Sequence, residues 1–344
     1  MSLVIVGTNH RYSPVRLREK IFFSKKRLQD ALDFLKETGA LKAGVILSTC
    51  NRVEIYGCAD TTEIGAYEIK SFISRYYEID GKDIYPYLYI YRDMDAARHL
   101  FRVASGLDSL ILGETQILSQ VKAAFCESEK NGFVDYPLNE VFDSAVSAAN
   151  RIHRETEISK GKLSIGSVAV DFIRNKIGSF SGKNILIIGV GKVTELVLKY
   201  LRKEKSDVIF ISNRTFEKAR SLASQIGAKA VRFDNLRKYL EKADIVITAT
   251  KSPHFIINKE TIEEAVRQKR LLIIDLALPR DVDPEVRDID GIELFDLEDL
   301  GAAIQKNRDR KNVEAQKSTQ IIELEVKGLW EHFSELEQEK ALLP

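Results

Sequence analysis

The chain of 344 residues contains only three cysteines, two methionines, one tryptophan and seven prolines. Three cysteines cannot all pair, and their spacing matches no metal-binding motif, so free thiols in a reducing cytoplasm are expected rather than a disulfide framework or a metal site. No stretch approaches the ~20 consecutive apolar residues that a membrane span needs, and the amino terminus reads as a first strand rather than a signal peptide. The sequence therefore predicts a soluble, cytoplasmic protein.

An excess of charge of one sign is also lacking, because 52 Lys and Arg residues face 51 Asp and Glu residues. A protein that coats nucleic acid carries a large basic excess, so any nucleic-acid surface here must be local. A solvated face is the default interpretation of a small basic group. The local groups are Arg151, Arg154, Lys160 and Lys162, and Arg267, Lys269 and Arg270.

The hydrophobic pattern predicts a multidomain α/β protein in four segments. Residues 1–150 mix short strands with amphipathic helices, which is typical of an α+β domain, and the cysteine motif described below makes it the expected catalytic domain. Residues 151–181 are expected to form a helical linker. Residues 182–300 alternate strand and helix, which predicts a parallel, Rossmann-type NADP-binding domain. Residues 301–344 are expected to form one long helix. Expected strands are Leu3–Val6, Gly44–Leu47, Val53–Tyr56, Ile185–Ile188, Val208–Ser212, Ile245–Thr248, Leu271–Asp275 and Ile292–Phe295.

The long helix carries an apolar seam in its second part. The seam residues recur at alternating spacings of four and three, as in helices that pack against a helical partner. The partner is either another helix or a second subunit. The seam consists of Ile322, Val326, Leu329, Phe333 and Leu336.

Cys50 is the most informative of the three cysteines. It follows the apolar run 43–47 at the point where a strand gives way to a loop. Arg52 lies two positions further on, and a neighbouring cation lowers the pKa of a thiol and favours the nucleophilic thiolate. The alternative is a packing role, since cysteine is among the most buried residue types. Cys58 and Cys126 are expected to be structural.

A glycine turn follows the strand Ile185–Ile188 and precedes an amphipathic helix. Two glycines there allow a tight turn and a close approach of the backbone to a pyrophosphate, which the positive end of the helix then stabilises. Thr194 replaces the usual third glycine and should weaken the packing of helix on strand without abolishing binding. The turn consists of Gly189, Val190, Gly191, Lys192, Val193 and Thr194.

The next strand ends at Asn213, Arg214 and Thr215, with no acidic residue at its tip. An acidic residue there would bind the ribose of NAD, whereas an arginine suits the 2′-phosphate of NADP. The predicted cofactor is therefore NADPH, with a solvated loop cation as the alternative interpretation of Arg214.

Several long motifs together resemble those of glutamyl-tRNA reductases, in order from about residue 4 to about residue 335. They include the expected nucleophile motif Ser48–Tyr56 and two signatures that follow one another in the first domain. The motifs are Thr8–Pro14, Ser48–Tyr56, His99–Ser109, Gly113–Lys122 and Leu278–Pro284.

The resemblance implies an NADPH-dependent reduction of glutamyl-tRNA(Glu) to glutamate-1-semialdehyde, the first step of five-carbon tetrapyrrole (porphyrin and haem) biosynthesis. Cys50 would attack the aminoacyl ester and form a glutamyl thioester, and His99 would act as acid or base, although His99 could also be merely structural. Arg52 would bind the substrate carboxylate and Glu114 the α-ammonium group. The implied substrate-binding residues are Thr49, Cys50, Asn51 and Arg52 on one side and Ser109, Glu114, Thr115, Gln116 and Gln120 on the other.

The resemblance also implies a handover of the aldehyde to glutamate-1-semialdehyde aminotransferase and a homodimer formed by a carboxyl-terminal helical region. That region is short in this sequence, so the homodimer stays an open alternative. Ser119 stands where the family usually has glycine. Two other functions remain: an NADP-dependent dehydrogenase of a small free metabolite, and a non-catalytic homologue that binds charged tRNA.

Overall fold

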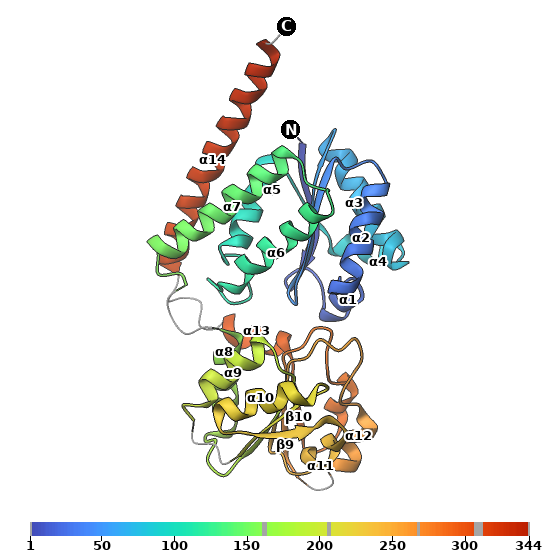
Figure 1. Ribbon diagram of the computed structural model, residues 1–344, viewed down its shortest axis with the longest axis vertical. Helices are drawn as coiled ribbons and strands as arrows, with labels where there is room; N and C mark the ends of the chain where they lie inside the picture. The colour runs from blue at the N-terminus through green and yellow to red at the C-terminus, as the bar shows by residue number, and fades with distance from the viewer. Residues whose placement is uncertain (1, 160–163, 205–207, 267–268, 306–311, 343–344) are drawn as a thin grey trace. The chain divides into compact units, whose positions relative to one another are not determined.

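The structure is a computed structural model of the chain, shown in Figure 1. Contacts divide the chain into two compact units, of which the first combines both ends of the chain. The first unit is Met1–Gly161 with Arg308–Pro344, and the second is Lys162–Asn307. Among the described residues, no helix is both long enough and apolar enough to cross a lipid bilayer. The described residues are 2–159, 164–204, 208–266, 269–305 and 312–342.

The first unit contains a four-stranded sheet in the order β2-β3-β1-β4, in which every neighbouring pair is antiparallel. The three strands expected in this region are confirmed, and each is extended by one or more residues. The fourth strand was not predicted, because its tyrosine-rich segment shows no clear alternation. The strands are β1 (Ser2–Asn9), β2 (Ala43–Ser48), β3 (Arg52–Ala59) and β4 (Tyr89–Arg92).

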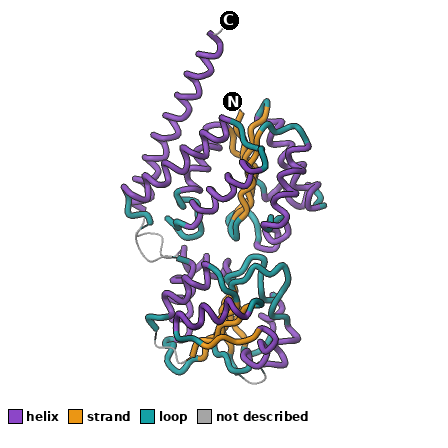
Figure 2. The backbone as a smooth tube through the Cα atoms, in the orientation of Figure 1, coloured by secondary structure: helices purple, strands orange, loops and turns teal. Residues whose placement is uncertain are grey.

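Helices cover both faces of this sheet, as Figure 2 shows. Successive residues of a strand point to opposite faces, so Leu3 and Ile5 enter one core while Val4 and Val6 enter the other. On the Val4 face lie α1 (Val15–Lys20), α2 (Lys25–Glu37), α3 (Thr62–Tyr77) and α4 (Gly81–Ile84), followed by a short 3₁₀ turn, η1 (Tyr85–Tyr87). On the Leu3 face lie α5 (Asp93–Ala104), α6 (Gln116–Lys130) and α7 (Tyr136–Glu155).

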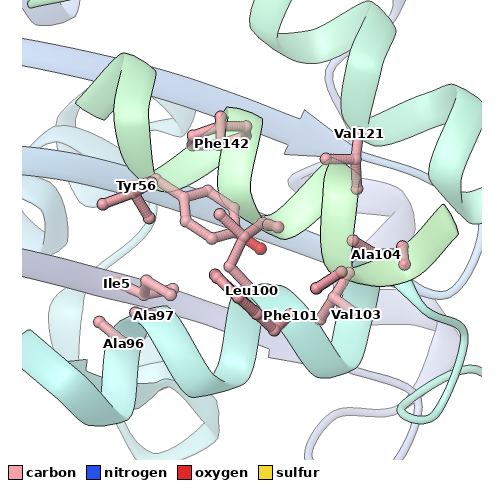
Figure 3. Close-up of a cluster of buried hydrophobic side chains, with 14 of the residues drawn as sticks. Ile5, Tyr56, Ala96, Ala97, Leu100, Phe101, Val103, Ala104, Val121 and Phe142 are labelled. Carbon is pink, nitrogen blue, oxygen red and sulfur yellow. The ribbon is translucent and has the colours of Figure 1, made fainter. Parts of the chain in front are cut away.

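The core on the Leu3 face is the larger of the two. Figure 3 shows how Leu100 and Phe101 of α5 lie among Ile5, Tyr56 and side chains of the neighbouring helices. Small residues of α5, Ala96, Ala97 and Ala104, allow this helix to lie close to the sheet. This close packing of α5 brings His99 to β3.

The apolar seam of the carboxyl-terminal helix has its partner within the same unit. In α14 (Asn312–Leu342), Ile322, Val326, Leu329 and Phe333 are buried in the Leu3-face core, where α14 contacts α5 and α7. Ion pairs from Arg98 to Glu323 and from Arg151 to Glu325 flank the seam. A helix of the same chain, rather than a second subunit, therefore covers these four residues.

The long helix expected from residue 301 is described as two helices. The first of them, α13 (Leu297–Gln305), belongs to the second unit, whereas α14 belongs to the first. The residues between them, 306–311, lie outside the described residues. The expected linker 151–181 is also divided between the two units. The end of α7 belongs to the first unit, and α8 (Ile165–Ile177) belongs to the second.

The second unit is a six-stranded parallel sheet in the order β10-β9-β8-β5-β6-β7, which is the Rossmann order. All five strands expected here are confirmed, whereas β7 is a short edge strand with one buried residue, Val231, and was not predicted. The strands are β5 (Asn184–Ile188), β6 (Val208–Asn213), β7 (Lys229–Arg232), β8 (Ile245–Thr248), β9 (Leu271–Asp275) and β10 (Ile292–Phe295). The remaining helices are α9 (Lys192–Leu201), α10 (Phe216–Ile226), α11 (Leu236–Leu240) and α12 (Lys259–Ala265), with 3₁₀ turns η2 (Phe233–Asn235) and η3 (Pro284–Asp288).

Candidate active site

A pocket opens in the first unit where β2 ends and α6 begins. It encloses about 340 Å³, counted out to its open mouth. Eight of the nine residues expected to bind substrate line it, while the ninth, Thr115, is exposed as the residue that precedes α6. The lining residues are Thr49, Cys50, Asn51, Arg52, Ser109, Leu110, Glu114, Gln116, Ile117 and Gln120.

Two apolar lining residues, Leu110 and Ile117, were not anticipated from the sequence. Ile117 could have been predicted from the spacing of Gln116 and Gln120, because residues four apart share a helix face and Ile117 flanks that face. The pocket therefore combines polar side chains from two segments with an apolar wall. Such a wall excludes water from a reacting ester.

The loop that carries Cys50 is held by hydrogen bonds on both of its sides. Thr49 N–H donates to the Arg52 carbonyl at 2.8 Å, and the N–H groups of Asn51 and Arg52 both donate to Thr49 Oγ1 at 3.2 Å. The N–H group of His10, which directly follows β1, donates to the Asn51 carbonyl. The tight turn between β2 and β3 thus presents Cys50 at a defined position at the sheet edge.

The thiol of Cys50 is protonated in this state at neutral pH. Burial raises the pKa of Cys50 to about 12, and the carboxylate of Glu114 adds to the increase, whereas Arg18 and Arg52 oppose it. The cations do oppose the increase, but the expectation of a pKa below the ordinary cysteine value was wrong, because desolvation outweighs them. Arg18, which the sequence analysis did not consider here, opposes the increase more than Arg52 does.

Glu114 is the titratable partner of Cys50 in the pocket. Burial raises the pKa of Glu114 to about 7, so its carboxyl group changes charge near neutral pH. Its position follows from the turn before α6, where Gly113 has φ 79° and a Cβ there would lie 2.1 Å from the Ile158 carbonyl oxygen. Only glycine fits this turn, and the turn presents Glu114 to the pocket.

Arg52 is fully engaged with two carboxylates. Its side chain is 1% exposed, and its guanidinium donates to Glu54 Oε1 at 2.7 Å and to Asp108 Oδ2 at 3.0 Å. It also donates to the Asp108 carbonyl at 2.6 Å. Asn9 and Arg11 donate to the same Asp108 carboxylate. The group expected to bind a substrate carboxylate therefore already has protein carboxylates as partners.

His99 lies in the same buried network and is not among the residues that line the pocket. Its Nε2 is 2.7 Å from Glu54 Oε1, and its ring stacks on Tyr91 with centroids 4.5 Å apart. Burial alone would raise the pKa of Glu54, but Arg52 and His99 outweigh it and hold this pKa well below its usual range. Arg52, Glu54 and Tyr56 alternate along β3 and so point to the face that α5 covers.

In the second unit, the glycine turn after β5 has the shape that a dinucleotide requires. Gly189 has φ 107°, and a Cβ there would lie 2.6 Å from the Ala249 carbonyl oxygen. Gly191 is the residue that precedes α9, and no atom of the described residues lies within 4 Å of the position that a Cβ would take there, so open space faces this backbone. Thr194 Oγ1 donates to the Gly189 carbonyl at 3.1 Å, which explains how threonine fits the third position.

Arg214 is exposed just beyond β6, the strand beside β5. Asn213 Nδ2 donates to the Thr215 carbonyl at 3.1 Å and orders the turn around it. The neighbouring Ser212 hydroxyl is buried with no hydrogen-bond partner among the described residues. The residues present fit a dinucleotide at this edge, with Arg214 beside the ribose position.

A pair of buried carboxylates, not predicted as site residues, organises the loop after β9. Asp275 accepts from Thr248 Oγ1 at 2.7 Å and from the N–H groups of Ala277, Asp281 and Val282. Asp281 in turn accepts from the Thr250 N–H at 2.8 Å. Thr250 follows Ala249, which contacts Gly189, so this pair connects the loop to the glycine turn. The feature of the sequence that pointed to this loop was the Leu278–Pro284 motif, which contains Asp281 and whose acidic residues had no predicted role.

The fold and the two sites define a class of protein: an oxidoreductase that uses a nicotinamide cofactor and carries a cysteine in a separate α+β domain. Residues 6–156 match the family model of the glutamyl-tRNAGlu reductase N-terminal domain, and residues 171–303 match that of shikimate / quinate 5-dehydrogenase. Glutamyl-tRNA reductase of Shouchella clausii is 39% identical over 95% of this chain and 72% of its own length. That of Pelotomaculum thermopropionicum is 40% identical over 95% of this chain and 74% of its own length.

Among solved structures, glutamyl-tRNA reductase from Methanopyrus kandleri matches with a TM-score of 0.55 at 35% identity, covering 98% of this chain and 82% of that one. The chain belongs to the glutamyl-tRNA reductase family. The resemblance inferred from the motifs is thereby confirmed.

Proposed function

We propose that this chain reduces the glutamyl ester of tRNA(Glu) to glutamate-1-semialdehyde with NADPH, the first step of tetrapyrrole biosynthesis. The observation that carries the proposal is the pocket that holds the Cys50 thiol between the turn 49–52 and the start of α6. The free aldehyde is reactive, so transfer to glutamate-1-semialdehyde aminotransferase is part of the proposal.

The first chemical step is acyl transfer to Cys50. The sulfur attacks the ester carbonyl, the bond from carbonyl carbon to ribose oxygen breaks, and the thiol proton ends on the released ribose hydroxyl. A thioester is more readily reduced than an ester or a carboxylate, so the covalent intermediate divides one difficult step into two easier ones. Leu110 and Ile117 keep water away from this acyl group.

Substrate binding itself favours ionisation of Cys50. The carboxylate of Glu114 raises the pKa of Cys50 in the free protein. An α-ammonium group that pairs with Glu114 would neutralise this charge and bring a cation near the thiol, which lowers the pKa of Cys50. Proton removal would then be coupled to the arrival of the correct substrate.

Arg52 acts in this proposal mainly by fixing the wall of the pocket. Its ion pairs with Glu54 and Asp108 link β3 to the segment that carries Ser109. His99 binds Glu54 and so acts through it, as a positioning residue rather than as the base that deprotonates Cys50. The polar side chains of Ser109, Gln116 and Gln120 remain for the substrate carboxylate.

The cofactor is held in the second unit by the turn of Gly189 and Gly191 and by Arg214. When bound, NADPH supplies the hydride that releases the acyl group from Cys50 as an aldehyde. The Asp275 and Asp281 carboxylates keep the loop beside this turn in place.

Single-turnover incubation with glutamyl-tRNA(Glu), followed by intact mass, tests the proposal. Without NADPH, the protein should gain one glutamyl group and release tRNA; addition of NADPH should remove the adduct and yield aldehyde. Cys50→Ser should abolish the adduct, while the exposed Cys126→Ser serves as the matched control. A folded protein that binds NADPH without forming an adduct would contradict the proposal and favour a dehydrogenase of a free metabolite.

A further inference from the structure

Residues 10–29 of this nearly neutral chain carry a local excess of positive charge. Seven of the 52 Lys and Arg residues fall there, but only one of the 51 Asp and Glu residues, Glu19. Outside this segment, acidic residues therefore outnumber basic ones. The basic residues are Arg11, Arg16, Arg18, Lys20, Lys25, Lys26 and Arg27.

Four of these side chains form an exposed basic face on α1 and α2. Arg16 and Lys20 are four residues apart on α1 and so share a helix face. After a link of four residues, Lys26 and Arg27 lie in the first turn of α2. All four are exposed. None has a carboxylate partner among the residues that the structure describes. Their charge is thus available to an anionic partner.

The segment that joins the two basic helices is hydrogen-bonded to the strand end that leads to Cys50. In Figure 1, α1 lies at the end of the sheet where β1 finishes. The link between α1 and α2 is tied to the end of β2, because Phe23 N–H donates to Ser48 Oγ at 3.0 Å. Arg18, on the buried side of α1, is near enough to Cys50 to affect the pKa of the thiol. The link between α1 and α2 therefore adjoins the strand end that carries the Cys50 turn, so a polyanion held on these two helices lies near the segment that forms the pocket.

The other basic groups that the sequence suggested have structural roles or lie elsewhere. Arg151 pairs with Glu155 and Glu325, and Arg154 lies 3.5 Å from Glu155. Lys269 donates to the Leu240, Glu241 and Ala243 carbonyls where α11 ends. Arg270 is exposed on the second unit. Lys160, Lys162 and Arg267 lie outside the described residues.

We infer that Arg16, Lys20, Lys26 and Arg27 bind the phosphate backbone of the substrate's tRNA beside its aminoacylated end. The inference rests on the proposed function, whose ester must reach Cys50 while the nucleic acid stays outside the pocket. Phosphate contacts of this kind position a nucleic acid without reading its sequence. They release counterions, so the affinity that they provide falls steeply as salt rises.

The test compares two quadruple variants that remove the same charge. The first changes Arg16, Lys20, Lys26 and Arg27 to Gln. The control changes four exposed lysines that already face carboxylates, Lys42, Lys82, Lys130 and Lys327, to Gln. Each protein is acylated without NADPH in single turnover, with glutamyl-tRNA(Glu) and with 2′(3′)-O-glutamyl-adenosine, which has the ester but no phosphate backbone.

For the first variant, the tRNA concentration giving half-maximal acylation should rise at least about tenfold at 0.1 M salt. The magnitude of the slope of log affinity against log salt should fall by up to about 3.6, which corresponds to four phosphate contacts at about 0.7–0.9 each. Acylation by glutamyl-adenosine should be unchanged in both variants, which also shows that they are folded.

Three outcomes would overturn the inference. They are an unchanged tRNA affinity in the first variant, an equal loss in the control variant, or an equal loss with both substrates. If the unmodified protein itself is not acylated by glutamyl-tRNA, the proposed function fails and this inference fails with it.

Discussion

In the pocket of the first unit, the carboxylate of Glu114 raises the pKa of the Cys50 thiol. The two groups come from segments 64 positions apart in the numbering, and the fold brings them to one site. Burial is the larger cause of the raised pKa of Cys50 and Glu114 adds to it, so a cationic group on the substrate that pairs with Glu114 would remove the second contribution. This relationship makes the reactivity of Cys50 dependent on the occupant of the pocket.

Glu114→Gln should make Cys50 more reactive in the absence of substrate. Removal of the negative charge lowers the pKa of Cys50, although burial, the larger cause, remains. The difference should emerge only above about pH 7, where Glu114 loses its proton. At a given pH below the pKa of Cys50, each decrease of this pKa by one speeds alkylation about tenfold, because the rate is proportional to the thiolate fraction.

Iodoacetamide alkylation against pH, in a Cys126→Ser background, measures this effect. Glu129→Gln, which changes an exposed carboxylate in the last turn of α6, is the control. Equal profiles for Glu114→Gln and its parent would contradict an electrostatic link between Glu114 and Cys50.

Glu54→Gln should destabilise the first unit and change its response to acid. Arg52 and His99 would lose a fully buried partner, and breaking a buried ion pair costs about 3–5 kcal/mol. Because the pKa of Glu54 is lowered in the folded state, its contribution to stability is complete above the ordinary glutamate value of about 4.3 and is lost as pH falls below it.

Urea unfolding between pH 3 and pH 7 tests this prediction. The acid-dependent loss should be smaller in Glu54→Gln than in the unmodified protein. Glu63→Gln, which changes an exposed carboxylate 3.8 Å from Arg92, should leave both the stability and its pH dependence intact. If Glu54→Gln loses as much stability at low pH as the unmodified protein does, groups other than Glu54 cause the acid-dependent loss.

Arg214→Ala should weaken NADPH binding and leave NADH binding nearly unchanged. A hydrogen bond between charged groups contributes about 1.5–3 kcal/mol, which corresponds to a loss of about 10- to 150-fold in affinity. Thioester formation on Cys50 should be unaffected, since it needs no cofactor. Titration with both dinucleotides measures the effect, and Arg220→Ala, on the exposed surface of α10, is the control. An equal loss for both dinucleotides would contradict a contact with the 2′-phosphate.

Asp275→Asn should destabilise the second unit and weaken dinucleotide binding. The amide nitrogen would face the N–H groups of Asp281 and Val282, which now donate to Asp275 Oδ2 at 2.9 and 3.0 Å. Each buried N–H left without an acceptor costs about 1–3 kcal/mol. Denaturation of the whole chain with and without dinucleotide should reveal both effects. Asp283→Asn, at the half-buried residue that precedes η3, is the control. Full stability of Asp275→Asn would refute the assigned role.

Val326→Ala should destabilise the first unit by about 1–3 kcal/mol, because Val326 is fully buried against α5 and α7. Leu324→Ala, two residues away and 64% exposed, should change stability by less than about 0.5 kcal/mol. Equal effects in urea unfolding would contradict the packing of the seam within the chain.

Local patterns were sufficient for much of the fold. Strand β5, the glycine turn and α9 are adjacent in sequence, so their order and chemistry could be predicted from residues 185–201 alone. The same holds for the seam of α14, whose spacing identifies a buried face. The spacing could not identify the partner, because α5 and α7 are separated from it by the whole second unit.

The membership of the pocket could be predicted only by resemblance, since Cys50 and Glu114 are far apart in the chain. The charge state of Cys50 was beyond the sequence. Arg52, its nearest cation in sequence, points into a buried network with Glu54, Asp108 and His99.

Neighbouring residues were sufficient to predict eight of the ten described strands, the dinucleotide turn and a thiol at a strand end, because each depends on a local pattern. Folding was required to establish which groups surround that thiol, which helices cover the seam of α14, and that α1 and α2 present a basic face beside the strand end of Cys50. Burial and electrostatic interaction depend on distances in space between segments remote in sequence, and these distances exist only once the chain has folded.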